Sequence, residues 1–178
     1  MAEATLSVLL DPACAGIPPT FLKRRHFRFG ATIIEMGWEG YGINKNRGIA
    51  AAWKSGADAA RGTLVATLDA DLQYQPEDLL RLRRELYEHS VDIVQGWRSA
   101  VGRRKDRRFH LSRGLNALLN GVFSMDLQDN KSGFVICARE VLLDLLNYKG
   151  HYAYWQSFIM VAAHAKGYSY KQVETIFE

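Results

Sequence analysis

The stretch of residues 63–95 constrains the fold more than any other part of this sequence. An apolar run at residues 63–68 predicts a buried strand, and it leads directly into an acidic turn at residues 69–73. Pro76 then opens a predicted helix that presents leucines on one face, and a second apolar run at residues 91–95 predicts another strand. A strand, a helix and a further strand in this order form the repeating unit of an α/β sheet with crossover helices.

The sequence on both sides of this stretch continues the same alternation of elements. Upstream, we predict strands and helices at residues 6–10 (strand), 18–28 (short helix), 31–35 (strand) and 49–61 (helix closed by Gly62). Downstream, we predict them at residues 111–123 (helix), 133–137 (strand), 140–146 (helix), 154–166 (helix closed by Gly167) and 168–176 (strand). We therefore predict a single α/β/α sandwich domain over residues 1–178.

The composition fits one globular domain. The chain has 178 residues, of which 48% are hydrophobic and 24% charged, enough for one sizeable core and unlike a disordered chain. Cys14 and Cys137 lie far apart without CxxC spacing, which argues against a disulfide scaffold or a zinc site and favours a reducing cytosol. Glu3 is unlike a secretory signal, and no apolar run approaches the roughly 18 residues of a membrane span. We expect a cytoplasmic protein whose contact with the inner face of a membrane is peripheral.

Positive charge is concentrated in one stretch of the chain. The net charge of +4 is modest, but basic residues gather at Arg98, Arg103, Arg104, Lys105, Arg107, Arg108 and Arg113. An anionic partner is expected to dock there. No RNP-like aromatic platform or known DNA-binding motif accompanies these charges, so nucleic acid is a weak alternative. An anionic lipid head or the phosphate of another ligand explains the same charges.

The acidic turn has the residue types of a site for a hard divalent cation. Asp69 and Asp71 are one residue apart at a predicted strand end, so both carboxylates can reach one cation. Ligands of open α/β sheets bind at the carboxyl ends of strands. Gln73 could add a carbonyl oxygen or hold a metal-bound water. The alternative is that both aspartates are ordinary turn residues that cap the helix after Pro76.

Several segments in this order resemble family 2 glycosyltransferases of the GT-A fold. The likeness is to the branch that contains dolichyl-phosphate mannose synthases and bacterial polyprenyl-phosphate sugar transferases, and it covers roughly residues 40 to 178. The acidic turn and the Asp-x-x-Ser-Gly-Phe segment are specific when they occur together. The matching positions are Asn46-Arg47-Gly48, Ala52, Gly56, Ala60, Gly62, Asp69-Ala70-Asp71-Leu72-Gln73, Pro76-Glu77-Asp78, Gly96-Trp97-Arg98, Ser112 to Asn116, Asp129-Asn130-Lys131-Ser132-Gly133-Phe134 and Gly167-Tyr168.

The resemblance implies a fold, a reaction and a set of site residues. It implies a mixed, mainly parallel sheet and inverting transfer from a nucleoside-diphosphate sugar to a polyprenyl phosphate or a growing surface glycan. Mg²⁺ or Mn²⁺ would be held by Asp69, Asp71 and Gln73. The donor would be bound by Asp11, Asn46, Gly48, Asp69, Ala70 and Asp71.

The acceptor side of the site also follows from the resemblance. In the polyprenyl-phosphate branch an Arg four residues before a Ser holds the acceptor phosphate, and Arg108 and Ser112 have that spacing. Arg98 lies where another phosphate-contacting Arg is expected, and Ser132 belongs to the same side of the cleft. The guanidinium fork suits phosphate oxygens, although each arginine alone could equally be a solvated surface charge.

Asp129 is the candidate catalytic residue. A carboxylate there could act as general base toward a sugar hydroxyl, whereas a phosphate acceptor is already ionised and needs none. The plain alternative is that Asp129 caps a turn. We interpret His110, His151 and His164 as surface or packing residues.

The beginning of the chain departs from the family pattern. Family members start with a strand and a Pro-x-x-Asn-Glu-like loop, followed by a second strand that ends in Asp-Asp-Gly-Ser. The first segment is absent, and residues 6–11 stand at the expected distance for the second strand. We expect this to expose a sheet position through which the protein forms a homodimer. The missing loops also motivate a second hypothesis, a catalytically incomplete GT-A-like module that binds a ligand or partner.

Overall fold

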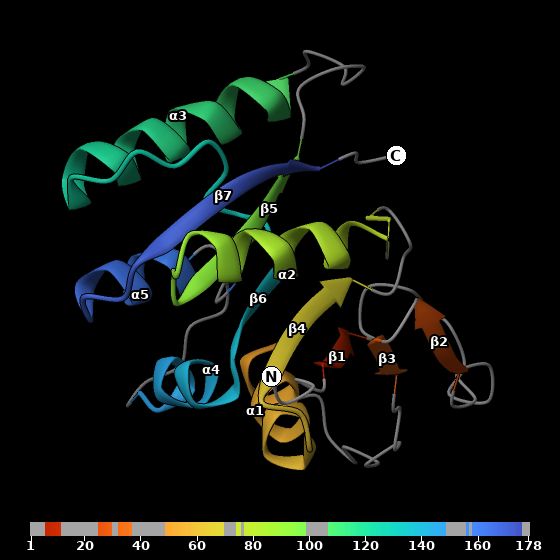
Figure 1. Ribbon diagram of the computed structural model, residues 1–178. Helices are drawn as coiled ribbons and strands as arrows, with labels where there is room; N and C mark the ends of the chain where they lie inside the picture. Colours follow the sequence, from red (N-terminus) through yellow and green to blue (C-terminus); the bar gives the residue numbers. More distant parts are fainter. Residues whose placement is uncertain are drawn as a thin grey trace.

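We describe a computed structural model of the protein, and the elements appear in Figure 1. The structure describes residues 6–11, 25–29, 32–36, 49–69, 74–75, 77–98, 107–148, 156 and 158–175, with the main chain alone for the first three ranges, Asp69 and Arg108. The strands are β1 (Leu6–Asp11), β2 (Arg25–Phe29), β3 (Thr32–Met36), β4 (Leu64–Asp69), β5 (Ile93–Arg98), β6 (Val135–Ala138) and β7 (Tyr170–Thr175). The helices are α1 (Ile49–Ala59), α2 (Asp78–Glu88), α3 (Arg107–Phe123), α4 (Arg139–Leu146) and α5 (Ile159–Ala165).

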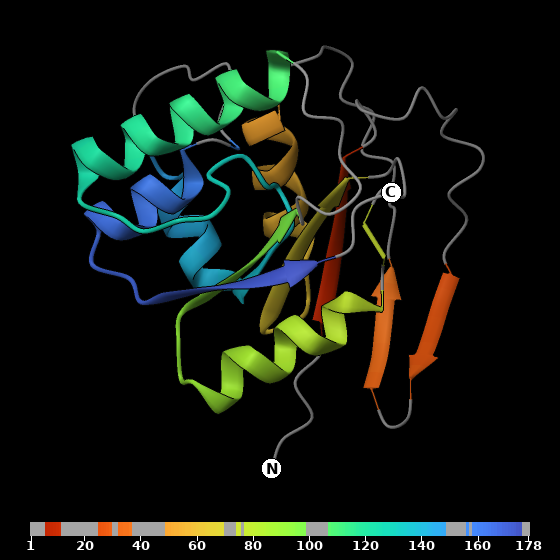
Figure 2. The ribbon, with the colours of Figure 1, turned by 90° about the horizontal axis from the view of Figure 1, so that it is seen from above.

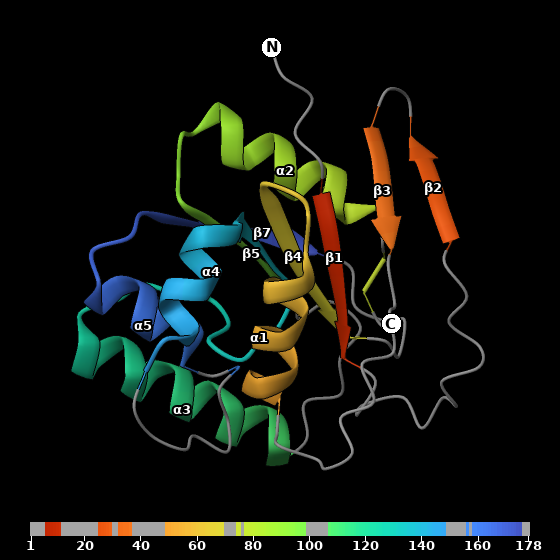
Figure 3. The same cartoon turned by 90° about the horizontal axis from the view of Figure 1, so that it is seen from below.

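The described strands form one mixed sheet in the order β2-β3-β1-β4-β6-β5-β7. Strands β3, β1, β4, β5 and β7 point the same way, because β1 is parallel to β3 and β4, β5 is parallel to β7, and both β4 and β5 are antiparallel to β6. β2 runs against β3. β6 thus enters in reverse between β4 and β5, and Figure 3 shows β1 beside β4 on the other side.

Alternating side chains of the central strands serve two separate cores. On β4, Leu64, Ala66 and Leu68 contact one core, and Val65 contacts the other. This two-residue period is what a strand covered on both faces requires. The sheet is therefore the middle layer of a sandwich, with a buried apolar layer on each side.

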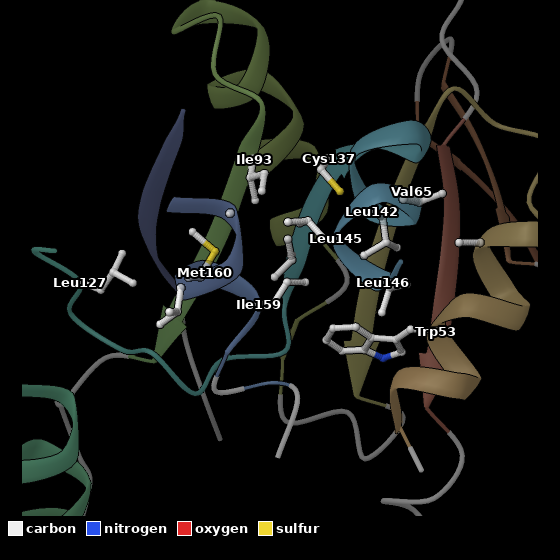
Figure 4. Close-up of a cluster of buried hydrophobic side chains, with 14 of the residues drawn as sticks. Trp53, Val65, Ile93, Leu127, Cys137, Leu142, Leu145, Leu146, Ile159 and Met160 are labelled. Atoms are coloured by element: carbon white, nitrogen blue, oxygen red, sulfur yellow. The ribbon is translucent and has the colours of Figure 1, made fainter. Parts of the chain in front are cut away.

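One helix covers one face of the sheet and several cover the other. The leucines that predicted an amphipathic helix, Leu79, Leu82 and Leu86, are buried in one core against Val94 and Ile136. The opposite core, shown in Figure 4, joins the sheet to helices α1, α4 and α5. Its labelled members are Trp53, Val65, Ile93, Leu127, Cys137, Leu142, Leu145, Leu146, Ile159 and Met160.

The predicted helix at residues 18–28 is wrong where the structure describes it. Residues Arg25–Phe29 form strand β2, which pairs with β3 from Phe29↔Thr32 to Arg25↔Met36. Two residues, Gly30 and Ala31, separate the strands, and a two-residue connection with glycine is typical of a hairpin. Pairing with a neighbouring strand outweighed local helix preference.

The predicted helix ends are confirmed at one position and shifted at another. After α5, Gly167 has φ 80°, its N–H donates to the carbonyl of His164, and the N–H of Tyr168 donates to the carbonyl of Ala163. These bonds form a Schellman motif, for which glycine is the favoured residue. Helix α1 instead ends at Ala59, before the predicted cap Gly62.

The sheet position beside β4 is occupied. β1 pairs with β4 along its whole length, from Leu6↔Leu64 to Asp11↔Asp69, and β3 pairs with the far side of β1. β4 therefore has a partner strand on each side, and the edges of the described sheet are β2 and β7. The uncovered edge that motivated the homodimer hypothesis is therefore absent from the described sheet at this position.

Candidate active site at the carboxyl edge of the sheet

The strand register brings the predicted site segments to one edge of the sheet. Thr67 on β4 pairs with Val135 on β6, Val135 pairs with Gln95 on β5, and Gln95 pairs with Gln172 on β7. Beyond this row β4 continues to its acidic end, β5 continues to Arg98, and β6 is preceded by the loop of residues 128–134. In Figure 1, β5 and β7 end side by side at this edge. This is the edge where open α/β sheets bind ligands.

The donor and metal residues are described in part. Asp69 is the last residue of β4, and its Cα is the register partner of Asp11, the last residue of β1. The sheet thus places two predicted donor-site residues side by side in the main chain. The other members of this group, Asn46, Gly48, Ala70, Asp71 and Gln73, lie outside the described residues. Within the described ranges, no three His, Cys, Asp or Glu side chains form a metal-binding group.

Arg98 and Asp129 form a bidentate ion pair. Nε of Arg98 donates to Oδ2 of Asp129 over 2.7 Å, and Nη2 donates to Oδ1 over 3.2 Å. Oδ1 also accepts the N–H of Lys131 over 2.9 Å. The side chains of Arg98 and Asp129 are 19% and 11% exposed, so the pair is largely shielded from water. Such a paired, two-pronged contact holds the guanidinium in a fixed orientation.

The segment after Asp129 is held from several elements. The hydroxyls of Ser132 and Tyr74 are 2.8 Å apart, and the N–H of Phe134 donates to the Ser132 hydroxyl. The hydroxyl of Thr67 donates to the carbonyl of Gly133. Because Ser132 is 1% exposed and these bonds are internal, its hydroxyl has a structural role in this arrangement. The predicted acceptor contact by Ser132 stays a prediction.

Two glutamines connect this loop to the adjacent strands. Nε2 of the fully buried Gln95 donates to the carbonyl of Ser132 over 2.8 Å. Gln172 on β7 donates through Nε2 to Oε1 of Gln95 and to the carbonyl of Asp129, and its Oε1 accepts the N–H of Gln128. The amide groups thus replace the ladder hydrogen bonds that a loop cannot make.

Asparagines on α3 hold the other side of the loop. Nδ2 of Asn116 and Nδ2 of Asn120 both donate to the carbonyl of Leu127. Oδ1 of Asn116 accepts the N–H of Asn130 over 2.7 Å, and Oδ1 of Asn120 accepts the N–H of Leu127. The helix that carries the predicted acceptor residues is therefore attached to the loop of Asp129 by polar contacts.

The predicted acceptor residues of α3 meet one further cation. Nζ of Lys131 lies 3.3 Å from Oγ of Ser112, and Arg108 precedes Ser112 by one helical turn. Among the described residues, no carboxylate forms an ion pair with Lys131. An ammonium and a hydroxyl that converge in this way can both donate to an anion.

A family model decides what kind of protein this is. The model for glycosyl transferase family 2 matches residues 41–146. The chain belongs to glycosyl transferase family 2. The matched range includes the acidic turn, the Arg98–Asp129 pair and helix α3, so the candidate site lies within the part of the chain that carries the family likeness.

A curated family 2 relative shares part of the sequence. Dodecaprenyl-phosphate galacturonate synthase from Rhizobium johnstonii is 42% identical over 67 residues. The match covers 38% of this chain and 19% of the relative. The matched stretch therefore spans about a fifth of the length of that protein.

Solved structures share the fold. Glucosyl-3-phosphoglycerate synthase from Mycobacterium tuberculosis, in complex with Mn²⁺, UDP and glucosyl-3-phosphoglycerate, matches 98% of this chain and 71% of its own, with a TM-score of 0.64 and 15% identity. In complex with Mn²⁺, UDP and phosphoglyceric acid, the same enzyme matches 73% of this chain and 45% of its own, with a TM-score of 0.57 and 20% identity. The α/β fold is thus similar to that of a GT-A glycosyltransferase.

Sequence reasoning did not single out several residues that build this site. Lys131, Gln95 and Gln172 were not predicted, although Gln95 is a polar residue at a buried strand position, which is an unusual place for an amide. That signal could have identified Gln95. Lys131 lies within the matched Asp129–Phe134 segment without a predicted role, and no local pattern marks Gln172, because the contacts of both residues join positions far apart in sequence.

Proposed function

We propose that this protein transfers a sugar from a nucleoside-diphosphate sugar to a polyprenyl phosphate, with inversion at the anomeric carbon. One observation carries the proposal: the family 2 match spans both the strand with the acidic turn and the loop of the Arg98–Asp129 pair, which the sheet brings to one edge. The name of the Rhizobium relative supports a polyprenyl-phosphate acceptor over a glycan acceptor. The reaction would take place at the inner face of the membrane.

The residues of the acidic turn fit Mg²⁺ or Mn²⁺. Asp69 stands at the carboxyl end of a central strand, and Asp71 and Gln73 add a carboxylate and an amide oxygen, which are the hard ligands that these cations prefer. The cation would offset the negative charge of the departing diphosphate. Asp11, Asn46 and Gly48 would contribute to donor binding beside it.

Arg98 would orient the acceptor phosphate. Its Nε and Nη2 are held by Asp129, so the direction of the guanidinium is fixed before the acceptor arrives. Arg108, Ser112 and Lys131 would add cationic and hydroxyl donors from α3 and its neighbouring loop. A preformed set of donors favours a dianionic head group over a neutral sugar hydroxyl.

The proposed role of Asp129 depends on the acceptor. With a polyprenyl phosphate, the nucleophilic oxygen is already ionised, and Asp129 would serve to hold Arg98 in place. With a glycan hydroxyl, Asp129 would be the base that removes the proton. The ion pair in the structure supports the first role.

Calorimetric titration tests the donor site. UDP, GDP, UDP-glucose and GDP-mannose are titrated into the protein with and without Mn²⁺, and the Asp69→Ala, Asp71→Ala double variant is the control. We expect one nucleotide family to bind in the presence of Mn²⁺ and the double variant to lose that binding. If the folded protein bound none of the four compounds, the binding-module hypothesis would be favoured.

A further inference from the structure

Helix α3 exposes most of its large apolar side chains and turns several polar ones inward. Leu111, Leu118 and Val122 are 64%, 60% and 65% exposed, and Leu115 and Phe123 are 39% and 37% exposed. With one exception, Tyr87 on α2, all exposed large hydrophobic residues in the described part of the chain lie on this helix. Exposed apolar groups gathered on one element mark an interaction surface.

The apolar residues form one continuous stripe. Leu111, Leu115, Leu118 and Val122 follow each other at intervals of four, three and four residues, which places them on one face of a helix. Ser112, Asn116 and Asn120 follow the same period on another face, and these are the side chains that contact the loop of residues 127–131. Figures 2 and 3 show α3 at the periphery of the molecule. We call the four apolar residues the α3 stripe.

Every formal charge on α3 is positive. The helix has 17 residues and no aspartate or glutamate. Arg107 is exposed one turn before Leu111, His110 and Arg113 are exposed on other sides of the helix, and the sequence before the helix adds Arg103-Arg104-Lys105, followed by Asp106. A helix with an apolar stripe and basic flanks is typical of binding in the plane of an anionic membrane surface.

We propose that the α3 stripe docks on the surface of an anionic lipid bilayer. The apolar residues would enter the boundary between head groups and acyl chains, and the arginines would contact anionic head groups. The same contact would hold the helix that carries Ser112 at the membrane surface. This inference deepens the proposed function and rests on it for the choice of the membrane as the site of the acceptor.

A second copy of the chain fits this surface less well. The α3 stripe is about 16 Å long and about 10 Å wide from the dimensions of a helix, on the order of 160 Å². A stable protein interface buries about 800 Å² on each partner. Two copies joined at this helix would also bring arginines of like charge into one interface, whereas a bilayer with anionic lipids offers the opposite charge.

Vesicle co-sedimentation of the full chain tests the docking. Vesicles of phosphatidylcholine with phosphatidylglycerol are compared with pure phosphatidylcholine vesicles, without nucleotide or acceptor. We expect binding to the anionic vesicles that weakens as salt is raised. The Leu118→Ser, Val122→Ser double variant should bind at least about tenfold more weakly, since each change removes an apolar side chain from the bilayer.

A matched control separates the stripe from general surface hydrophobicity. Tyr87→Ser removes the exposed large apolar residue of α2, which covers the other face of the sheet, and should leave vesicle binding unchanged. No binding of the wild type, or equal binding of the stripe variant, overturns the proposal. A wild-type dimer in sedimentation that becomes monomeric in the stripe variant would also overturn it, in favour of a second copy.

The two proposals fail separately. Nucleotide binding by the stripe variant shows that it is folded, so loss of vesicle binding in that variant reports on docking alone. Vesicle binding without nucleotide binding would refute the donor site and leave the docking surface intact.

Discussion

Gly96 lies where the structure leaves no room for a side chain. A Cβ atom at this position would lie 2.6 Å from Cδ1 of Phe134 and 2.9 Å from Cγ2 of Thr175. Both neighbours are buried, and the hydroxyl of Thr175 donates to the carbonyl of Trp97 over 3.0 Å. Neither can move away without breaking packing or a hydrogen bond. The Gly96→Ala variant therefore forces a shift of the Phe134 ring.

The expected cost follows from overpacking. Adding a methyl group to a filled core costs about 1–3 kcal/mol, and we expect Gly96→Ala to lower the free energy of unfolding by that amount. Gly114→Ala on α3 is the matched control, because nothing lies within 4 Å of its Cβ position. Alanine favours a helix over glycine by about 0.8–1 kcal/mol, so this control should be more stable than the wild type. The free energies of unfolding of the two variants and the wild type would be measured by urea denaturation followed by circular dichroism. Equal or greater stability of Gly96→Ala would refute the reasoning.

Three further predictions concern single side chains. Burial raises the pKa of the Cys137 thiol to about 12, so in a Cys14→Ser background it should not react with a thiol reagent at pH 8 until the protein is unfolded, and fast native reaction would contradict this. The hydrogen bond from Lys171 lowers the pKa of Glu85. The stability that this contact adds is present above the ordinary glutamate pKa and is lost as the pH falls through the lowered pKa. A Lys171→Met variant should lack this acid-dependent loss when unfolding is measured as a function of pH. Asp129→Asn should lower the free energy of unfolding by about 1–3 kcal/mol because its guanidinium partner loses a charged acceptor, and unchanged urea denaturation would show that the pair contributes nothing.

Local sequence patterns predicted the elements that form their own amphipathic faces. The helix with Leu79, Leu82 and Leu86 was found because its apolar period is helical, and its buried face agrees. Gly167 was found because a left-handed residue after a helix favours glycine. The order of strands and helices then follows from the α/β alternation.

Contacts between segments far apart in the sequence determine the features that local patterns could not predict. β2 is a strand because β3 lies next to it. The Arg98–Asp129 pair depends on β6 entering in reverse between β4 and β5, which places a loop beside a strand 31 residues earlier. The outward direction of the α3 stripe is likewise a tertiary property, because helical periodicity shows that leucines share a face and not which side that face takes.

A transfer assay tests the central claim most directly. Labelled UDP- and GDP-sugars are incubated with the full chain, a polyprenyl phosphate and Mg²⁺ or Mn²⁺, and label is counted in the solvent-extracted lipid. The account predicts cation-dependent label in the lipid fraction from one donor, lost in the Asp69→Asn, Asp71→Asn double variant and kept in Asp126→Asn, which changes an exposed aspartate after α3. Nucleotide binding without any transfer to the lipid, or transfer that persists in the double variant, would contradict it.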